Sequence, residues 1–266
     1  MLLAIDISNT TIKAGVFQRD KLLADWRFAT ERQKLTDEYA ILLLSLFRAS
    51  GIDLTLIDGV SISCVVPPLR SVFVELAQRY LHVTPLMVGP DVESGITLSI
   101  DNPREVGADR IVNVAATHHL YGGPAIAIAL GTATVFDCVS ATGEYLGGAI
   151  APGMVTALES LTRSAAQLYQ IELIRPPRAI GTNTVHTMQS GLVLGYAALV
   201  EGLVARLKSE MLVPGGRQKV QVIATGGLAE VIAPETTAID IVDQRLTLKG
   251  LRLIYELNCP FPVQKS

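Results

Sequence analysis

Two stretches far apart in the chain share one pattern of apolar and small polar residues. LLAIDISNTTI begins at residue 2 and AIAIALGTATV at residue 125. Each joins an apolar run to a second strand-like run through a turn of small or hydroxyl residues, which predicts a β-hairpin. Aligning Ser8 with Gly131 pairs Asn9 with Thr132, so the chain is interpreted as two halves that open with the same hairpin. Chance recurrence of short apolar runs is the alternative.

Strand-like and helix-like segments alternate along the remaining sequence, which predicts an α/β fold. We expect strands at residues 2–6, 11–17, 21–30, 59–66, 84–88, 95–100, 125–130, 135–140, 144–150 and 220–225. We expect helices at residues 36–50, 67–81, 153–168, 185–211 and 246–258, and one that ends near residue 120.

Composition excludes several classes of protein. The 266 residues are 49% hydrophobic and 18% charged, with a net charge of −3 and no basic stripe, so a nucleic-acid surface is not expected. Cys64, Cys138 and Cys259 are far apart, which excludes a CxxC site and favours a reducing compartment. The first residues lack a basic signal segment, and no apolar run is expected to span a membrane. We therefore expect a cytoplasmic protein that binds neither nucleic acid nor membrane.

The two turns are suited to phosphate. Small and hydroxyl residues leave backbone N–H groups uncovered, and such groups bind phosphate oxygens. Asp6 ends its strand, where it could hold Mg²⁺ through water, as a metal nucleotide requires. A third small-residue turn, ATGGL at 224–228, could let an adenine ring lie against the backbone. Each turn alone is a weak signal, and the three in this order are a stronger one.

A charge pair stands behind a Gly-Ala step in REVGADRI at residues 104–111. Pro103 precedes it and an apolar helix follows, so one interpretation is a helix N-terminus that favours acidic residues. The other interpretation is a functional role for Asp109 and Arg110, which the rest of the chain has to support. The motif alone does not separate them.

Taken together, these motifs resemble the type III pantothenate kinase family of the actin/sugar-kinase/Hsp70 superfamily. The matching segments run through nearly the whole chain: DISNTTIKAGVF (6–17), CVVPPL (64–69), NPREVGADRIVN (102–113), GTATVFD (131–137), YLGGAIAPG (145–153), IGTNTVHTMQSG (180–191) and VIATGGLA (222–229). The resemblance implies two ribonuclease-H-like α/β domains with mixed sheets, residues 1–117 and 118–266, on either side of a nucleotide cleft. The last helix could return toward the first domain.

The resemblance also implies a function and residue roles. The family phosphorylates pantothenate to 4'-phosphopantothenate with ATP, the first step of coenzyme A biosynthesis, and Asp109 matches its general base. Mg²⁺ would be held indirectly by Asp6, and a homodimer would complete the substrate site with Thr184. The implied ATP-binding residues are Asp6, Ser8, Asn9, Thr10, Lys13, Gly131 and Thr132, and the implied substrate-binding residues are Gly107, Ala108, Asp109, Arg110, Thr184 and Ile100. His118, His119 and His186 lack ligand or triad spacing and are interpreted as structural.

Three positions depart from the family pattern. Ser8 replaces a glycine, Ile100 replaces a tyrosine, and Ala129 replaces an aspartate that holds a monovalent cation. A site for K⁺ or NH₄⁺ is therefore doubtful. The alternatives are a catalytically weakened paralogue that binds nucleotide or pantothenate in a regulatory role, and a kinase of a different small alcohol.

Overall fold

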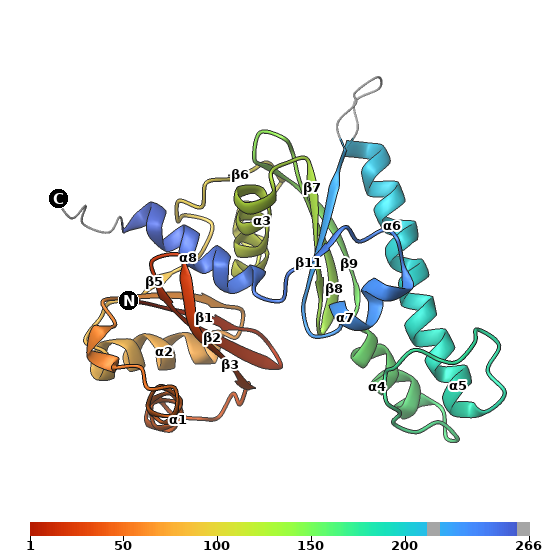
Figure 1. Cartoon of the computed structure of the whole chain (residues 1–266), viewed down its shortest axis with the longest axis horizontal. Helices are drawn as coiled ribbons and strands as arrows, with labels where there is room; N and C mark the ends of the chain where they lie inside the picture. The colour runs from red at the N-terminus through yellow and green to blue at the C-terminus, as the bar shows by residue number, and fades with distance from the viewer. Residues whose placement is uncertain (212–218, 260–266) are drawn as a thin grey trace. The chain divides into compact units, whose positions relative to one another are not determined.

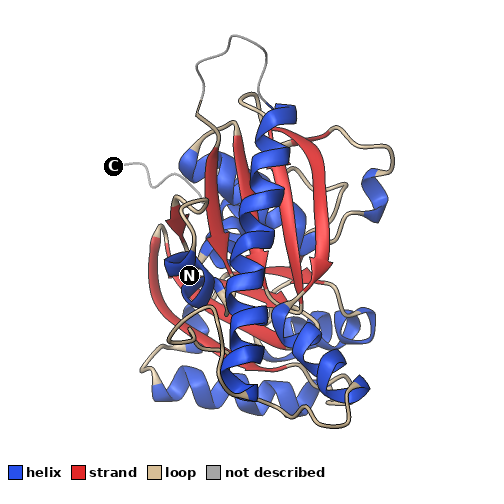
Figure 2. Ribbon diagram, turned by 90° about the vertical axis from the view of Figure 1, so that its right-hand side faces the viewer, coloured by secondary structure: helices blue, strands red, loops and turns tan. Residues whose placement is uncertain are grey.

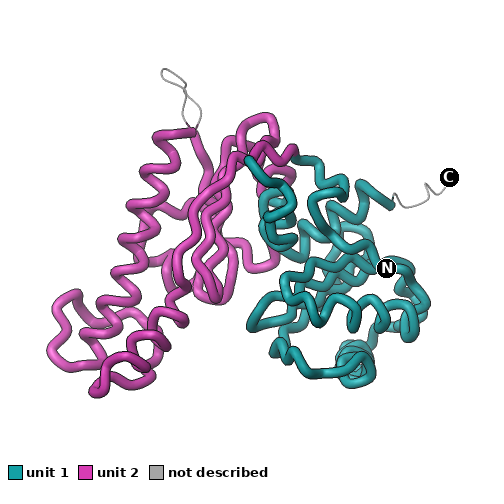
Figure 3. The backbone as a smooth tube through the Cα atoms, turned by 180° about the vertical axis from the view of Figure 1, so that it is seen from behind, with its two compact units in different colours: residues 1–96, 101–116, 247–266 teal, residues 97–100, 117–246 magenta. Residues whose placement is uncertain are grey.

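The computed structural model describes residues 1–211 and 219–259. The chain forms two compact units, coloured separately in Figure 3. Unit 1 contains residues 1–96, residues 101–116 and the C-terminal segment from residue 247. Unit 2 contains residues 97–100 and 117–246. The division into two domains at residues 1–117 and 118–266 stays a prediction.

Unit 1 is built on a sheet with strand order β3-β2-β1-β4-β5. Figure 1 shows α1 and α2 on one face of this sheet and α8 on the other. The strands are β1 Leu2–Ile7, β2 Thr11–Gln18, β3 Lys21–Ala29, β4 Gly59–Cys64 and β5 Leu86–Met87. The helices are α1 Thr36–Ala49, α2 Pro67–Tyr80, the first part of α3 Ala108–Tyr121 and most of α8 Leu246–Asn258, with single 3₁₀ turns at Leu54–Leu56 and Pro103–Glu105.

The alternation of side chains along β1 decides which residues enter the core. All of β1 is buried. Leu3, Ile5 and Ile7 pack with residues of α1 and α2 in one apolar cluster. Because successive side chains of a strand point to opposite faces, Asp6 lies on the other face of the sheet. An apolar strand can therefore carry one carboxylate without placing it in that cluster.

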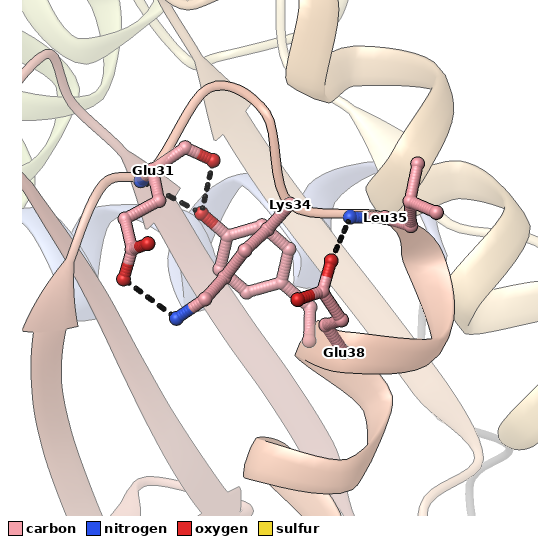
Figure 4. Close-up of polar contacts among 5 residues, drawn as sticks. Glu31, Lys34, Leu35 and Glu38 are labelled. Carbon is pink, nitrogen blue, oxygen red and sulfur yellow. Dashed lines mark hydrogen bonds and ion pairs between the residues drawn. The ribbon is translucent and has the colours of Figure 1, made fainter.

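The segment between β3 and α1 is tied down by polar contacts (Figure 4). The backbone N–H of Leu35 donates to Glu38 Oε2 over 2.8 Å, which satisfies one free donor at the helix start. Lys34 Nζ lies 2.6 Å from Glu31 Oε1. Tyr39 Oη, whose ring is buried, accepts from Glu31 N–H over 2.9 Å and donates to Glu31 O over 3.0 Å. The helix expected from the Thr-Asp-Glu start is confirmed.

Unit 2 repeats the plan of unit 1. Its sheet has the order β11-β10-β7-β8-β9-β6. The strands are β6 Thr97–Leu98, β7 Ala125–Leu130, β8 Ala133–Val139, β9 Glu144–Pro152, β10 Gln221–Thr225 and β11 Ile241–Val242. The helices are α4 Met154–Ser164, α5 Thr184–Gln189, α6 Gly195–Met211 and α7 Ala229–Ile232, with a π-helical turn at Ser190–Leu194 and a 3₁₀ turn at Ala233–Glu235.

The internal repeat predicted from the two hairpins is confirmed by strand order and direction. β3-β2-β1-β4-β5 corresponds to β9-β8-β7-β10-β11, with antiparallel pairs in the hairpins and parallel pairs beyond the first strand. The residue alignment through the turn was wrong by one position. Ile7 pairs with Ile12, whereas Leu130 pairs with Thr134, so the second turn is one residue shorter. Thr10, rather than Asn9, therefore corresponds to Thr132.

The longest helical run of unit 2 corrects one expectation. Thr184–Met211 is a continuous run of 28 residues, and by length and composition alone it could cross a membrane. No such run is expected from the sequence. Figure 2 shows this helix lying across the strands of unit 2. Met188, Val193 and Val200 enter the apolar cluster on that sheet, and 28% of the most apolar 18 residues of the helix are buried.

Two mixed α/β sheets with this strand order confirm the expected fold class. The expected helix at 153–168 is shorter, because α4 ends at Ser164. The short helix α7 was not expected, since four residues carry no helical periodicity.

Candidate functional site

Asp6 is the penultimate residue of β1 and is only 2% exposed. It is in register with Lys13 on β2 and Ser63 on β4. Ser8 Oγ donates to Asp6 Oδ2 over 3.1 Å. Asp6 Oδ1 and the Ser63 hydroxyl are buried without a hydrogen-bond partner among the described residues. A buried carboxylate oxygen without a donor fits a water molecule or a hydrated cation.

Charge links Asp6 to two other candidate residues. Burial raises the pKa of Asp6 to about 6, the Lys13 ammonium opposes that shift, and the Asp109 carboxylate adds to it. Burial also raises the pKa of Asp109, against the N–H and the charge of Arg110 and the charge of Lys13. The fold thus brings Lys13 close enough to lower the pKa of both carboxyl groups, and Asp109 close enough to raise the pKa of Asp6.

Asp109 is the second residue of α3. Its Oδ1 accepts from Arg110 N–H over 2.9 Å, and Gly107 O accepts from the same N–H over 3.0 Å. A Cβ at position 107 would lie 2.6 Å from Asp109 Oδ1. Glycine at 107 therefore leaves the space that the carboxylate occupies. The helix-start interpretation of the motif is correct, and it is compatible with a chemical role for Asp109.

The first hairpin turn is held by residues that follow β3. Thr30 N–H donates to Thr10 O over 3.0 Å, and Thr30 Oγ1 donates to Ser8 O over 2.7 Å. Arg32 Nη2 donates to Asn9 Oδ1 over 3.2 Å. These bonds hold the turn in one conformation, and within it the Ser8 N–H donates to Thr11 O over 3.3 Å.

The second hairpin turn, in unit 2, is held in a similar way. Thr132 O accepts from Gly153 N–H over 2.9 Å and from Thr156 Oγ1 over 2.8 Å. A Cβ at position 153 would lie 2.1 Å from Gly131 O, so only glycine allows this close approach. The start of α4 therefore supports the turn that carries Gly131 and Thr132.

The end of β7 carries no counterpart of the charges around Asp6. Ala129 is in register with Val135 on β8 and Thr225 on β10. Thr225 Oγ1 is buried without a hydrogen-bond partner in the described part of the chain. The third small-residue turn follows, and a Cβ at Gly226, whose φ is +100°, would lie 2.4 Å from Leu130 O.

The remaining candidates lie elsewhere in unit 2. Ile100 is half-buried, and a Cβ at Gly147 would lie 3.7 Å from its Cγ2. Thr184 is exposed and is the first residue of α5, where Asn183 Oδ1 accepts from His186 N–H over 2.9 Å. The predicted residues therefore fall into two groups, one in each unit. Their roles stay predictions.

Sequence reasoning missed the residues that hold the turns, namely Thr30, Arg32 and Thr156. A signal for Thr30 was present, because it ends the strand expected to follow the first hairpin. Gly153 had been noted within GGAIAPG, but only as part of a family motif. No local pattern distinguishes a residue that reaches back to a turn 20 or so positions away.

A metal fits this site only together with a ligand. No group of three or more His, Cys, Asp or Glu side chains comes together in the described ranges 1–211 and 219–259. Mg²⁺ commonly binds through one or two carboxylates, several waters and substrate phosphates. Asp6, with its unpartnered oxygen, fits that pattern, and the adjoining turn offers donors to a polyphosphate.

Solved structures share the fold at low sequence identity. A Baf family protein from Campylobacter jejuni, described as a transcriptional activator, has a TM-score of 0.60 at 17% identity, covering 96% of this chain and 98% of that one. An inorganic polyphosphate/ATP-glucomannokinase from an Arthrobacter strain has a TM-score of 0.53 at 15% identity, covering 97% and 98%. These likenesses show a shared fold.

Sequence relatives are much nearer. A family model described as type III pantothenate kinase matches residues 2–206. The type III pantothenate kinase of Roseiflexus castenholzii is 56% identical over 97% of this chain and 99% of its own length. That of Roseiflexus sp. strain RS-1 is 55% identical over the same shares. On these matches, the chain belongs to the type III pantothenate kinase family.

Proposed function

We propose that this protein transfers the γ-phosphoryl group of ATP to the primary hydroxyl of pantothenate, giving 4'-phosphopantothenate and ADP at the first step of coenzyme A biosynthesis. The relatives bear the name of this activity. The observation that supports it best is the cluster of Asp6, Lys13 and Asp109 in unit 1. Phosphoryl transfer to an alcohol needs a base for the hydroxyl and positive charge at the phosphates.

Asp109 is the proposed general base. Burial raises its pKa, which makes the carboxylate a better proton acceptor than an exposed aspartate. The hydroxyl oxygen bonds to the γ-phosphorus as the bond to the bridging oxygen of ADP breaks. The hydroxyl proton passes to Asp109 and then to solvent.

The neighbours of Asp109 would bind pantothenate. Arg110 supplies a fork of donors that suits the substrate carboxylate better than a lysine would. Gly107 and Ala108 directly precede Asp109, and the lack of a side chain at Gly107 leaves room for the Asp109 carboxylate. The family resemblance adds Ile100 and Thr184 to the substrate side, with Thr184 delivered by a second copy of the chain.

The nucleotide-binding residues that the family resemblance implies include residues of each hairpin turn. The proposed residues of the first turn offer backbone and hydroxyl donors, and Lys13 and the second turn add to them. Asp6 would hold the Mg²⁺ of MgATP through water, and that ion would supply positive charge at the phosphates. The proposed nucleotide set is Asp6, Ser8, Asn9, Thr10, Lys13, Gly131 and Thr132.

We propose further that activity does not depend on K⁺ or NH₄⁺. Ala129 offers no oxygen ligand from its side chain, and Val135 beside it offers none either. Equal rates in sodium and potassium buffers are expected. A strong preference for potassium would contradict this proposal.

A homodimer is proposed because unit 2 exposes large apolar side chains on adjoining elements. They are Leu146 and Ile150 of β9 and Val155 and Leu161 of α4. Clusters of this kind commonly mark protein interfaces. Light scattering at micromolar concentration should give twice the chain mass, and a monomer would contradict the proposal.

We propose a cytoplasmic enzyme that needs no nucleic acid or membrane partner. ATP and a reducing environment are both supplied there. Cys64, Cys138 and Cys259 are free thiols, and burial raises the pKa of Cys138 to about 12, so that thiol stays protonated.

The experiment that tests the function is ADP release from MgATP with and without pantothenate. Wild-type protein should release ADP only when pantothenate is present. Asp109→Asn should reduce that rate by at least about 100-fold, because general-base catalysis contributes about 10²–10⁴-fold. Pantothenate-independent release, or an unchanged rate in Asp109→Asn, would contradict the proposal.

A further inference from the structure

A residue outside the predicted nucleotide set lies against the first hairpin turn. Arg32 belongs to the segment between β3 and α1, and its Nη2 donates to Asn9 Oδ1 over 3.2 Å. Thr30, two residues earlier, bonds to the carbonyls of Ser8 and Thr10 in the same turn. The turn and this segment therefore form one hydrogen-bonded unit.

The segment is fixed from the core side as well. Both backbone groups of Glu31 bond to Tyr39 Oη, at 2.9 and 3.0 Å, and the Tyr39 side chain is 1% exposed. The Lys34 ammonium lies 2.6 Å from the Glu31 carboxylate, and Figure 4 shows this contact beside the hydrogen bonds of the Glu31 backbone. Arg32 therefore extends from an anchored backbone, and less conformational freedom is lost when it binds a ligand.

The contact determines which way the Asn9 amide is turned. The arginine donates to the amide oxygen, so the NH₂ group of Asn9 is left as a donor. Arg32 is exposed, and among the described residues Asn9 is the partner of its guanidinium. Of five guanidinium N–H groups, one is used here, and the others remain for an external acceptor. The pair presents donors at the tip of the turn.

We propose that Arg32 is a positioning residue of the polyphosphate site, which orients the Asn9 amide and offers its own guanidinium to phosphate oxygens of a nucleoside di- or triphosphate. This inference rests on the proposed function. The role proposed for Arg32 differs from that of Lys13. The Lys13 ammonium acts as a point charge, whereas a guanidinium binds phosphate through paired donors.

Calorimetric binding of ATP, ADP and AMP, each with Mg²⁺, tests the proposal. Arg32→Ala should weaken ATP and ADP binding by about ten-fold, the size expected for a charge-assisted hydrogen bond, and AMP binding by much less. Arg32→Lys should recover only part of the loss. Arg48→Ala is the matched control, because Arg48 is an exposed arginine on α1 of the same unit. It should bind all three nucleotides as wild type does.

Coupling to Asn9 is tested by a double-mutant cycle. Once Asn9→Ala is present, Arg32→Ala should weaken ATP binding by a clearly smaller factor than it does alone. In steady-state assays Arg32→Ala should raise the KM for ATP and leave the KM for pantothenate unchanged. If Arg32 were merely structural, Arg32→Ala would lower the thermal stability and would not raise the KM for ATP selectively over the KM for pantothenate.

The proposal is overturned if Arg32→Ala binds ATP as tightly as wild type, or if Arg32→Ala and Arg48→Ala weaken it equally. It is also overturned if AMP and ATP binding fall by the same factor. Failure of the proposed function is a separate result: wild-type protein would then bind ATP without phosphorylating pantothenate, and the binding comparison would still decide the role of Arg32.

Discussion

The two hairpin turns share a backbone frame and differ in charge. In unit 1, Thr10 O accepts a hydrogen bond over 3.0 Å from Thr30, the residue after β3. In unit 2, Thr132 O accepts one over 2.9 Å from Gly153, the residue after β9. In each unit a threonine hydroxyl also bonds to a carbonyl of the turn, from Thr30 in one case and Thr156 in the other. The supporting hydrogen bonds are therefore duplicated along with the fold.

The side chains at equivalent positions are not duplicated. The penultimate residue of the first hairpin strand is Asp6 on β1 in unit 1 and Ala129 on β7 in unit 2. Their hairpin partners are Lys13 and Val135, respectively. One turn thus stands beside a buried, partly balanced charge, and the other beside Ala129, Val135 and the uncharged Thr225 hydroxyl. Topology supplies two equivalent frames, and individual residues decide which of them can serve a metal nucleotide.

The largest expected effect comes from removing the charge that distinguishes the two turns. Asp6→Asn should lower kcat by about 10²–10³-fold, the loss typical of deleting one well-placed electrostatic group. Steady-state ADP release with saturating MgATP and pantothenate measures it. Asp20→Asn, an exposed aspartate between β2 and β3, serves as the control and should have wild-type kcat. If Asp6→Asn lowered kcat by less than ten-fold, the charge at Asp6 would not be what distinguishes the function of the two turns.

Ionisation of Asp6 should make the free energy of unfolding depend on pH. Burial raises the pKa of Asp6 from its ordinary value of 3.8 to about 6, so the folded protein binds the proton more tightly than the unfolded chain does. The free energy of unfolding should therefore fall as the pH rises from 4 to above 6, by about 3 kcal/mol from this group. Urea unfolding of wild type and Asp6→Asn at pH 4 and pH 8 measures the difference. An equal difference between the two proteins at both pH values would refute the buried-charge account.

Installing the missing charge in unit 2 should have a smaller effect on stability. Ala129→Asp places a carboxylate in register with Val135, where unit 1 has Lys13. We expect the free energy of unfolding at pH 8 to fall by about 2 kcal/mol, since a partly buried carboxylate lacks a partner. The loss should be smaller at pH 4, where the group is protonated. Ala129→Asn, which adds a similar volume without charge, is the matched control for thermal melts. Equal losses in both variants at pH 8 would point to volume rather than charge.

The smallest effects should come from the hydroxyls that support each turn. Thr30→Val and Thr156→Val each remove one bond to a turn carbonyl, at 2.7 and 2.8 Å. Each should raise the KM for ATP by about five-fold, the factor that about 1 kcal/mol produces. Thr162→Val is the control, because Thr162 bonds within α4 to Glu159 O. If only Thr30→Val changes the KM for ATP, the two turns share a backbone conformation but only the first contributes to ATP binding.

Much of the fold could be predicted because it rests on local patterns. The buried runs of β1 and β7 and the helical spacing of α1 and α2 are readable along the chain. The repeat was predicted from two turns, and the strand orders confirm it. The alignment of Asn9 with Thr132 failed because only strand pairing reveals that one turn is a residue shorter.

The candidate site was only partly predictable. Asp6 and Asp109 were found through motif and family resemblance, but nothing local indicates that burial raises the pKa of both. Thr30, Arg32 and Thr156 were missed, because each acts on a turn that is distant along the chain. Such bonds form only when a third strand or the following helix folds back on the hairpin.

The sequence by itself determined the class of fold, the two hairpins and the residue types able to bind phosphate. These follow from the spacing of apolar residues and from side-chain chemistry, which neighbouring positions specify. Tertiary structure alone decided that Asp6, Lys13 and Asp109 affect one another and that Asn9 is oriented by Arg32. The physical reason is that electrostatic energy and hydrogen bonding depend on distance through space and on burial, and both are properties of the folded chain.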